Sequence, residues 1–340
     1  MQGGKMIIMN KWIRRGLAPV LAVPLILTAC SNGDDGEDDT IEVGEVTRSI
    51  FYAPLYVAIE EGFFADENID IDLTTTWGGD TTMTALLSNS ADVALVGSET
   101  SIYVNAQNPS DPVVNFGALT QTDGTFLVSR EPMPDFSWED LEGTSYLGQR
   151  AGGMPQMAGE YALRQNGFDP HEDVELDQSV DFENIASAFA SGNGDFVQLF
   201  EPNATQFEEE GIGHVVASFG EESGTLPYTS FITKESMIEE DEDVLVRFNR
   251  AIYEAQQFVE NESPEAVAAS IAPYFDEASE EVIANVVERY DSQDSYATDP
   301  YIDEEGWDHL QDIMDESGEL PKRMDYEDLV NTDITDLALE

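Results

Sequence analysis

The sequence predicts an α/β protein built from two lobes that share a cleft. Short apolar segments alternate with amphipathic segments from residue 41 onward, which is the pattern of βαβ units and of a mainly parallel sheet covered by helices. The alternation restarts after the proline-rich stretch 131–135. About 300 residues follow the N-terminal region, a length that favours two domains over one. Two lobes with a cleft between them can close on a ligand by hinge bending.

The first lobe is predicted to open with strands and helices in regular succession. Residues 41–47 alternate like a strand, and Pro54 suits the first position of a helix that runs to Phe64. Further strands are expected at 69–75, 92–96, 113–119 and 125–129, with a short helix at 81–88.

The second lobe repeats this order. Its strands are expected at 144–147, 174–180, 196–200 and 214–219, and its helices at 156–165, 182–191 and 205–210. The first crossing between the lobes is expected near 131–135. A second crossing near 224–228 returns the chain to a last strand at 228–233.

The remaining C-terminal residues read as almost entirely helical. One apolar stripe is formed by Val244, Phe248, Ile252, Ala255 and Val259, and a further helix begins at Pro264 with Ser263 as its cap. These helices must pack against a lobe, so the first lobe is predicted to be discontinuous, with residues 41–130 plus 229–340. The second lobe is then 131–228.

The first thirty residues have the features of an export signal. Lys11, Arg14 and Arg15 precede an apolar run over 16–28, and Cys30 follows Ala29. The apolar run is shorter than the roughly 20 residues of a membrane-spanning helix. A small residue followed by cysteine is the lipobox of bacterial lipoproteins, so we expect residues 1–29 to be removed and Cys30 to carry the lipid anchor.

A short acidic tether is expected after Cys30. Residues 30–40 are polar and acidic and have little to bury, so they should remain solvated between the membrane and the folded lobes. Cys30 is also the single cysteine of the chain, which excludes a disulfide, a cysteine metal site and a cysteine nucleophile.

The charge balance is extreme. Ten Lys and Arg residues follow Cys30 against seventy Asp and Glu, which argues against nucleic acid or an anionic lipid surface as a partner. The chain nevertheless holds 41% hydrophobic residues, so it has the composition of a folded protein. Our interpretation is an adaptation to high salt, where the Debye length falls to roughly 3 Å at 1 M.

Candidate ligand contacts follow the predicted strands, because ligands of open α/β sheets lie beyond the carboxyl ends of strands and against helix starts. The predicted ligand-binding residues are Arg48, Phe51, Tyr52, Trp77, Gly97, Ser98, Glu99, Thr122, Asp123, Gly153, Met154, Glu201 and Tyr228. Arg150 is a further candidate, although each of Arg48 and Arg150 could instead neutralise neighbouring acids.

These residue types suggest how a ligand would be held. Gly97, Ser98, Gly153 and Met154 would present backbone N–H groups, or simply form tight turns. The rings of Phe51, Tyr52 and Trp77 could stack on a flat ligand, or pack in the core. The carboxylates of Glu99, Asp123 and Glu201 would accept hydrogen bonds from ligand N–H groups, and they argue against a bare inorganic anion. This mixture favours an aminated or heteroaromatic solute over a simple sulfonate.

Enzyme chemistry finds little support in the sequence. His171, His214 and His309 lack the spacing of paired metal ligands. No nucleophile elbow, phosphate loop or dinucleotide fingerprint is present. We therefore expect no catalytic residue, no metal and no cofactor.

A family resemblance lies in residues 51–58 (FYAPLYVA), followed by 61–64 (EGFF). With these motifs the chain resembles the nitrate/sulfonate/taurine-type substrate-binding proteins, which share a domain with fungal thiamine-pyrimidine synthases. The likeness continues through 91–97, 188–192, 200–202 and 248–271.

The resemblance implies a type II periplasmic-binding-protein fold, a monomer, and a permease with its ATPase as partners. Relatives of this type bind alkanesulfonates, taurine, nitrate or aminopyrimidines, so the ligand stays open between an aminopyrimidine-like and a sulfonate-like solute. The alternative is an exported pyrimidine synthase. Those enzymes need a reactive lysine, a histidine and a cysteine-rich motif, whereas this chain has only Lys234 and Lys322 after Cys30 and lacks the cysteine motif.

Overall fold

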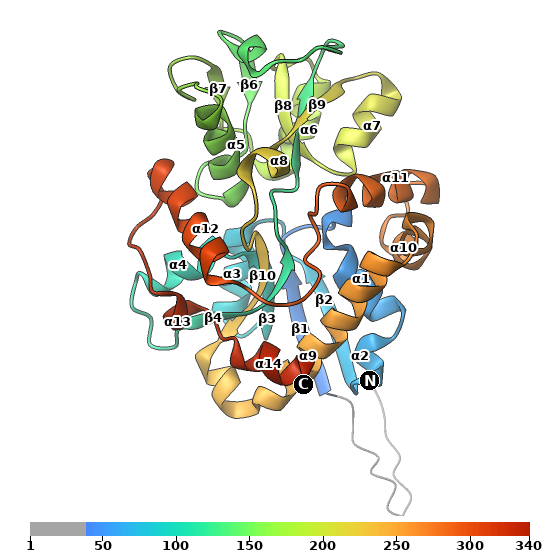
Figure 1. Cartoon of the computed structure of the whole chain (residues 1–340), viewed down its shortest axis with the longest axis vertical. Helices are drawn as coiled ribbons and strands as arrows, with labels where there is room; N and C mark the ends of the chain where they lie inside the picture. The colour runs from blue at the N-terminus through green and yellow to red at the C-terminus, as the bar shows by residue number, and fades with distance from the viewer. Residues whose placement is uncertain (1–38) are drawn as a thin grey trace, which may run out of the picture. The chain divides into compact units, whose positions relative to one another are not determined.

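The computed structural model describes residues 39–340 and contains two five-stranded sheets, each covered by helices (Figure 1). The first sheet has the strand order β2-β1-β3-β10-β4, and the second has the order β7-β6-β8-β5-β9. We call each sheet with its helices a lobe. The predicted signal segment and Cys30 lie outside the described residues.

The first sheet is mainly parallel, as predicted. Its strands are β1 (Asp39–Glu45), β2 (Ile69–Thr75), β3 (Val93–Gly97), β4 (Val113–Thr120) and β10 (Thr229–Lys234). β10 runs antiparallel to both of its neighbours, β3 and β4. Because Asp39 and Thr40 pair with β2, the predicted tether was two residues too long.

Side chains alternate between the two faces of this sheet, since successive strand residues point to opposite sides. Leu95 and Phe231 face the cluster that contains Phe248, whereas their neighbours Ala94 and Ile232 face a second cluster. Helices α3 (Gly79–Leu87) and α4 (Glu99–Asn105) lie on the second side. The expected helix from Pro54 to Phe64 is instead divided at Gly62, where φ is +84°, into α1 (Ala53–Glu60) and α2 (Phe63–Asp66).

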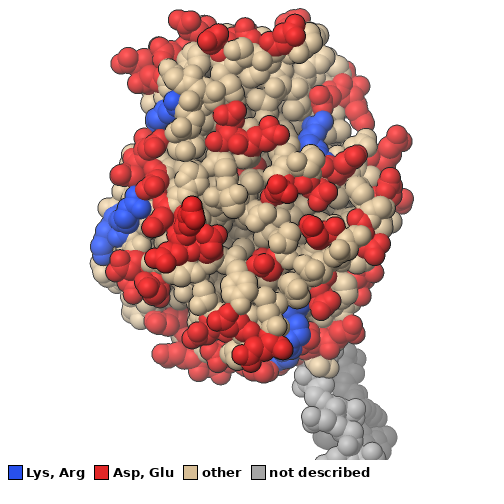
Figure 2. All heavy atoms as spheres, in the orientation of Figure 1, with Lys and Arg blue, Asp and Glu red and all other residues tan. Residues whose placement is uncertain are grey.

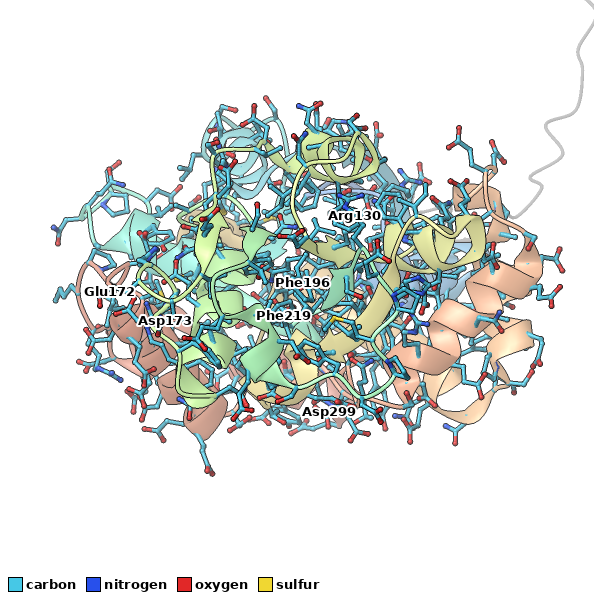
Figure 3. The ribbon with its side chains drawn as sticks, turned by 90° about the horizontal axis from the view of Figure 1, so that it is seen from above. Arg130, Glu172, Asp173, Phe196, Phe219 and Asp299 are labelled. Atoms are coloured by element: carbon cyan, nitrogen blue, oxygen red, sulfur yellow. The ribbon has the colours of Figure 1, made fainter. Side chains whose placement is uncertain are left out.

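The second sheet also has one antiparallel strand. Its strands are β5 (Thr125–Ser129), β6 (Ser145–Leu147), β7 (Glu175–Asp177), β8 (Phe196–Phe200) and β9 (His214–Ser218). Its helices are α5 (Met154–Gln165), α6 (Ile185–Ala190), α7 (Asn203–Glu210) and α8 (Phe219–Ser223). Phe196 and Phe219 are buried in its core and lie near the middle of the molecule in Figure 3, with Glu172 and Asp173 toward the outside.

The first crossing differs from the prediction. Thr125–Ser129 pairs with β8 and β9, so this strand belongs to the second lobe and the crossing is residues 121–124, not 131–135. Residues 131–138 run along the second lobe instead, where Met133, Phe136 and Trp138 pack against its core. The return crossing is at 224–228, as expected, and the two crossings are joined by hydrogen bonds from Leu226 N to Gln121 O (3.0 Å) and from Tyr228 N to Thr120 O (3.1 Å).

The C-terminal region is helical, as predicted. It contains α9 (Glu235–Asn261), α10 (Pro264–Ile271), α11 (Glu280–Asp291), α12 (Glu304–Glu316), α13 (Tyr326–Leu329) and α14 (Asp333–Leu339). The predicted stripe of α9 is buried against α1, α2 and α14, and the Ser263 side chain caps α10. Between residues 39 and 340, none of the helices combines the length and the apolar character that a membrane span needs.

Candidate ligand-binding site

A cavity of about 520 Å³ lies between the two lobes. Six of the predicted ligand-binding residues line it: Tyr52, Gly97, Glu99, Gly153, Met154 and Tyr228. They come from the segment before α1, the end of β3, the starts of α4 and α5, and the return crossing. Strand ends and helix starts therefore form the cavity, as the sheet architecture predicts.

Glu99 is the one carboxylate buried in this cavity lining, and it joins the two lobes. Its side chain is 4% exposed, and its Oε1 accepts a hydrogen bond from the backbone N–H of Met154 in the second lobe (3.2 Å). Its Oε2 has no hydrogen-bond partner among the described residues. Burial raises the pKa of Glu99 to about 7, although backbone N–H donors oppose this shift.

Gly97 provides the space for that carboxylate. A Cβ atom at residue 97 would lie 2.1 Å from Glu99 Oε2. Any other residue would therefore push the Glu99 side chain out of its position.

Asp123 and Tyr228 lie buried at the two crossings, and Asp123 Oδ2 and the Tyr228 hydroxyl each have no hydrogen-bond partner among the described residues. Asp123 accepts hydrogen bonds from the backbone N–H and the hydroxyl of Thr125, and it does not line the cavity. Burial raises its pKa to about 6. The pKa of Tyr228 is also raised, first by burial and then by the negative charge of Asp123.

Four other predicted ligand-binding residues do not line the cavity. Phe51 packs against Phe200, Tyr228 and Tyr290, with ring centroids 5.0–6.0 Å apart. Trp77 is 52% exposed and lies outside the cavity lining. The hydroxyl groups of Ser98 and Thr122 bond to those of Ser230 and Ser295, respectively, both at 2.9 Å. A direct ligand contact by these four residues stays a prediction.

Arg48 neutralises an acid, which was the alternative left open by the sequence. Its guanidinium is 2.8 Å from the fully buried Glu45 carboxylate and lies over the Tyr274 ring at 4.9 Å. Glu45 also accepts hydrogen bonds from Tyr56 and Thr75, both at 2.6 Å. The sequence did not single out Glu45, because an acid that ends a strand is common in so acidic a chain.

Glu201 does not line the cavity and instead pairs with Arg289 of α11. Its carboxylate is 2.6 Å from the Arg289 guanidinium and accepts hydrogen bonds from the backbone N–H and hydroxyl of Thr205. Burial raises the pKa of Glu201, and the positive charge of Arg289 opposes the shift. Since Arg289 also pairs with Glu208 (2.8 Å), it holds α11 against the second lobe.

Apolar side chains make up much of the cavity wall, and the sequence reasoning missed them. They include Val46, Met83, Leu87, Val96, Phe182 and Phe200. Arg150 lies at the rim and is 3.3 Å from Asp80, so this predicted base bridges the lobes at an exposed position. Val46, Val96 and Phe200 end or follow strands, where the positional rule that found Tyr52 and Glu99 could have found them. Met83 and Leu87 lie in α3, which a rule based on strand ends does not reach.

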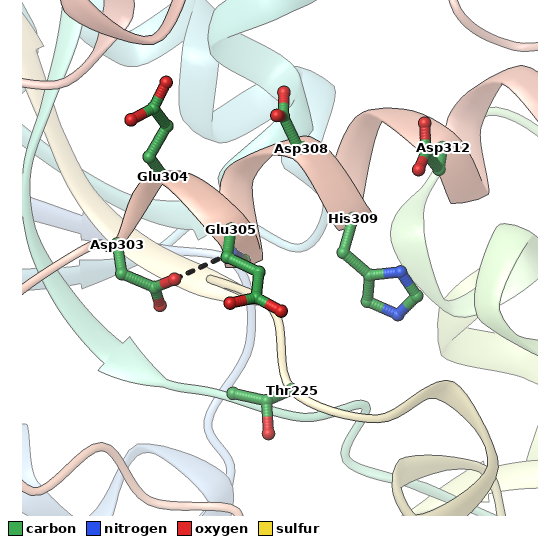
Figure 4. A pocket seen from close by; sticks show the side chains of 8 residues that line it. Thr225, Asp303, Glu304, Glu305, Asp308, His309 and Asp312 are labelled. Carbon is green, nitrogen blue, oxygen red and sulfur yellow. Dashed lines mark hydrogen bonds between the residues drawn. The ribbon is translucent and has the colours of Figure 1, made fainter.

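A second hollow, of about 810 Å³, lies over α12 and is lined mainly by acids (Figure 4). His309 projects into it beside Asp312, and its Nε2 is 2.7 Å from the carbonyl oxygen of Ser223. The three histidines and both lysines of the described chain lie outside the cavity between the lobes. Within residues 39–340, no group of three or more His, Cys, Asp or Glu side chains is arranged to hold a metal.

Comparisons with known proteins agree with this architecture. Residues 50–266 match the family model described as NMT1/THI5 like. The chain is 55% identical to YtlA of Bacillus subtilis, which carries the name of a binding protein, over 96% of this chain and 98% of the relative. It is 24% identical to the formylaminopyrimidine-binding protein of Halalkalibacterium halodurans, over 93% and 98% of the two chains.

The solved structures share the fold. The alkanesulfonate-binding protein SsuA of Xanthomonas axonopodis pv. citri, bound to MOPS, superposes with a TM-score of 0.69 at 16% identity, covering 87% of this chain and 99% of the other. The predicted periplasmic-binding-protein fold is thereby confirmed. Since the family model and the YtlA likeness both span most of the described residues, the chain belongs to the NMT1/THI5-like family, as its resemblance to the nitrate/sulfonate/taurine-type binding proteins predicts.

Proposed function

We propose that this protein is the solute-binding component of an ABC importer. It takes a small polar solute into the cavity between its lobes and delivers it to a permease that is driven by an ATPase. The supporting relatives are named as binding proteins, which favours a transport role without catalysis.

The observation that carries the proposal is the cavity itself. Its volume of about 520 Å³ lies within the range of roughly 300–1,000 Å³ that is usual for small-molecule sites. Its walls come from both lobes, and Glu99 and Arg150 make polar contacts across it. A solute that contacts both walls binds the closed arrangement more tightly, so it shifts the population toward closure.

The rival function, an exported pyrimidine synthase, would need a reactive group beside the solute. The Lys234 side chain is half-buried and bonds to Asn89, and Lys322 is exposed. Neither lysine and no histidine of the described chain reaches the cavity, so no observation favours this alternative.

The N-terminal sequence also supports a cellular location for the protein. We propose that the protein works outside the cytoplasmic membrane as a monomer, anchored by a lipid on Cys30. Mass spectrometry of the membrane-extracted protein should find an acylated N-terminal Cys30, and Cys30→Ser should release the protein into the soluble fraction. An unacylated wild-type protein would contradict the anchor.

The binding function is tested with the lipid-free protein that begins after Cys30. Native mass spectrometry should detect one solute per chain from a panel of aminopyrimidines and alkanesulfonates. The bound solute should also raise the melting temperature, because a ligand at a hundredfold excess over its Kd adds about 2.7 kcal/mol of stability. If neither the panel nor a metabolite extract gives saturable binding, the proposal is wrong.

A further inference from the structure

We propose that residues 280–316 form a C-terminal brace, which spans the hinge and favours the arrangement in which the two lobes lie close together even without a solute. The brace consists of α11, the connecting segment 292–303 and α12. It is attached to the first lobe, and it reaches the second lobe on both sides of the crossings (Figure 1). This inference goes beyond the proposed function, because the brace acts before any solute is bound.

The connecting segment adds a third strand to the hinge. Backbone hydrogen bonds of 2.8–3.1 Å join residues 118–121 to residues 295–300, which run in the opposite direction. Gln121 is bonded on both sides, since its N–H donates to Ser295 and its carbonyl accepts from Leu226 of the return crossing. The hinge is therefore a three-stranded ribbon, and the brace forms one of its edges.

Helix α11 is fixed to the first lobe but carries side chains that bind the second lobe. The helix packs against α10 and against the turn Ile50–Tyr52 before α1. Its Arg289 guanidinium is 2.6 Å from Glu201 and 2.8 Å from Glu208, which follow β8 in the second lobe. Rotation of the second lobe away from the first would have to stretch or break these two ion pairs.

Tyr290, the next residue of α11, joins the first crossing to the second lobe. Its buried hydroxyl donates to the carbonyl of Gly124 (2.9 Å) and accepts from the backbone N–H of Glu201 (3.3 Å). Just beyond the helix, the side chain of Gln293 accepts a hydrogen bond from the hydroxyl of Ser218, at the end of β9 (2.7 Å). The contacts of Arg289 thus continue along the start of the connecting segment.

Helix α12 makes a similar connection on the other side of the crossings. It packs against α4 and α13 of the first lobe and against α5 of the second. His309 Nε2 is 2.7 Å from the carbonyl oxygen of Ser223, which ends α8, and the His309 ring meets the Tyr161 ring of α5 edge-on at 5.7 Å. The second lobe is therefore held from two sides by one continuous C-terminal segment.

These contacts favour the close arrangement without help from a solute, because every partner belongs to the protein. A protein that already populates its binding-competent arrangement loses less affinity to the cost of closure. Salt should weaken the brace little, since Glu201 is fully buried in its pair with Arg289. The pair between Asp80 and Arg150 at the cavity rim is exposed and should be screened.

A distance between the lobes in the solute-free protein tests the brace. Spin labels on Glu61→Cys and Glu142→Cys, in a protein that begins after Cys30, report the separation of the lobes. The protein is unfolded and refolded to remove any co-purified solute, and it is measured in 1 M KCl. Adding Arg289→Met should lower the population at the shortest distances at least about twofold.

Glu208→Gln tests the same contact with less risk to folding. The amide oxygen can still accept from the backbone N–H of Val215, as Glu208 Oε1 does (3.2 Å), and the buried pair of Arg289 with Glu201 is left intact. The charge opposite Arg289 is lost, so the distance distribution should move in the same direction by a smaller amount.

Arg250→Met is the matched control, because it also removes an arginine from an ion pair. Arg250 of α9 pairs with Glu67 (2.9 Å), and both residues belong to the first lobe. This variant should leave the distance between the lobes unchanged.

Unchanged distributions in both Arg289→Met and Glu208→Gln would overturn the brace. An equal change in Arg250→Met would also overturn it, because the effect would then be a general loosening of the protein. If Arg289→Met does not fold, the result for Glu208→Gln decides. None of these outcomes involves a solute, so the proposed function stands or fails by its own binding test.

Discussion

At the scale of single residues, the position of the Glu99 side chain depends on the absence of a side chain at Gly97. The carboxylate occupies the space that a side chain at 97 would fill, so the glycine is required by the contact and not by its backbone conformation. Together the two residues hold the carboxylate against the end of β3, where it accepts a hydrogen bond from the Met154 N–H of the second lobe.

Replacing Gly97 should therefore disturb the site. In Gly97→Ala, the new Cβ would displace the Glu99 carboxylate and break its contact with Met154, which should weaken solute binding by more than about tenfold. Gly44→Ala is the control, since a Cβ there has only ordinary contacts, the nearest at 3.5 Å. Calorimetric titration of both variants checks this, and equal loss of affinity in both would count against the role of Gly97.

The buried Glu99 should also give the solute-free protein a pH-dependent stability. Its folded pKa of about 7 lies above the unfolded value near 4.5, so the folded state holds this proton more tightly. Its contribution to stability is fully present below pH about 4.5 and is lost as the pH rises through about 7. The loss is on the order of 3 kcal/mol.

Denaturant unfolding of the wild type and Glu99→Gln from pH 4.5 to pH 8.5 measures this contribution. The unfolding free energy of the wild type, measured relative to that of Glu99→Gln, should decrease steadily as the pH rises. A difference that is constant over this range would show that Glu99 titrates normally.

At the scale of elements, periodicity predicted most strands and helices because each is decided by local side-chain alternation. Partner choice is not local. Residues 125–129 have the apolar character of a strand, but no feature within them shows whether they pair with β4 or with β8 and β9. The proline-rich stretch suggested a crossing, yet Phe136 and Trp138 anchor it to the second lobe.

The binding site could be predicted from the sequence about as far as the strands and helices could. The rule that ligands gather beyond strand ends identified Tyr52, Glu99 and Met154, which do meet at the cavity. It also selected Glu201, which has an equivalent position after β8. Glu201 instead forms an ion pair with Arg289, a residue 88 positions away. A contact between such distant residues depends on the docking of α11, which local sequence does not encode.

The Arg289 contact should contribute measurably to stability. Arg289→Met leaves the buried Glu201 carboxylate without its charged partner, and we expect a loss of about 2–4 kcal/mol in unfolding free energy. The double variant Arg289→Met, Glu201→Gln should recover part of that loss. Arg323→Met, which breaks exposed pairs with Asp308 and Asp312, should cost less than about 1 kcal/mol. Similar losses for Arg289→Met and Arg323→Met in urea unfolding would contradict this account.

At the scale of the whole molecule, the surface is dominated by carboxylates. On the face drawn in Figure 2, acids are spread over both lobes, whereas Lys and Arg occur only at separate points. Seven arginines of the described chain have a carboxylate within 4.0 Å, and Arg130 bonds instead to the carbonyls of Phe189, Asn193 and Gly194. Most acids therefore have no basic neighbour to balance them.

Salt should consequently stabilise the folded protein. Raising KCl from about 0.01 M to 1 M shortens the Debye length from roughly 30 Å to 3 Å and screens the repulsion among exposed acids. The melting temperature should rise steeply across this range, and the same experiment in sucrose serves as a control for excluded-solute effects. A melting temperature that is insensitive to salt would contradict the interpretation of the charge as a high-salt adaptation.

Closure of the two lobes on a solute is the central claim, and a distance between the lobes tests it most directly. Since Cys30 is the single native cysteine, spin labels can be placed on Glu61→Cys in the first lobe and Glu142→Cys in the second, in a protein that begins after Cys30. We expect a broad distance distribution without solute and a shorter, narrower one at saturation. An unchanged distribution in the presence of a solute that demonstrably binds would contradict the account.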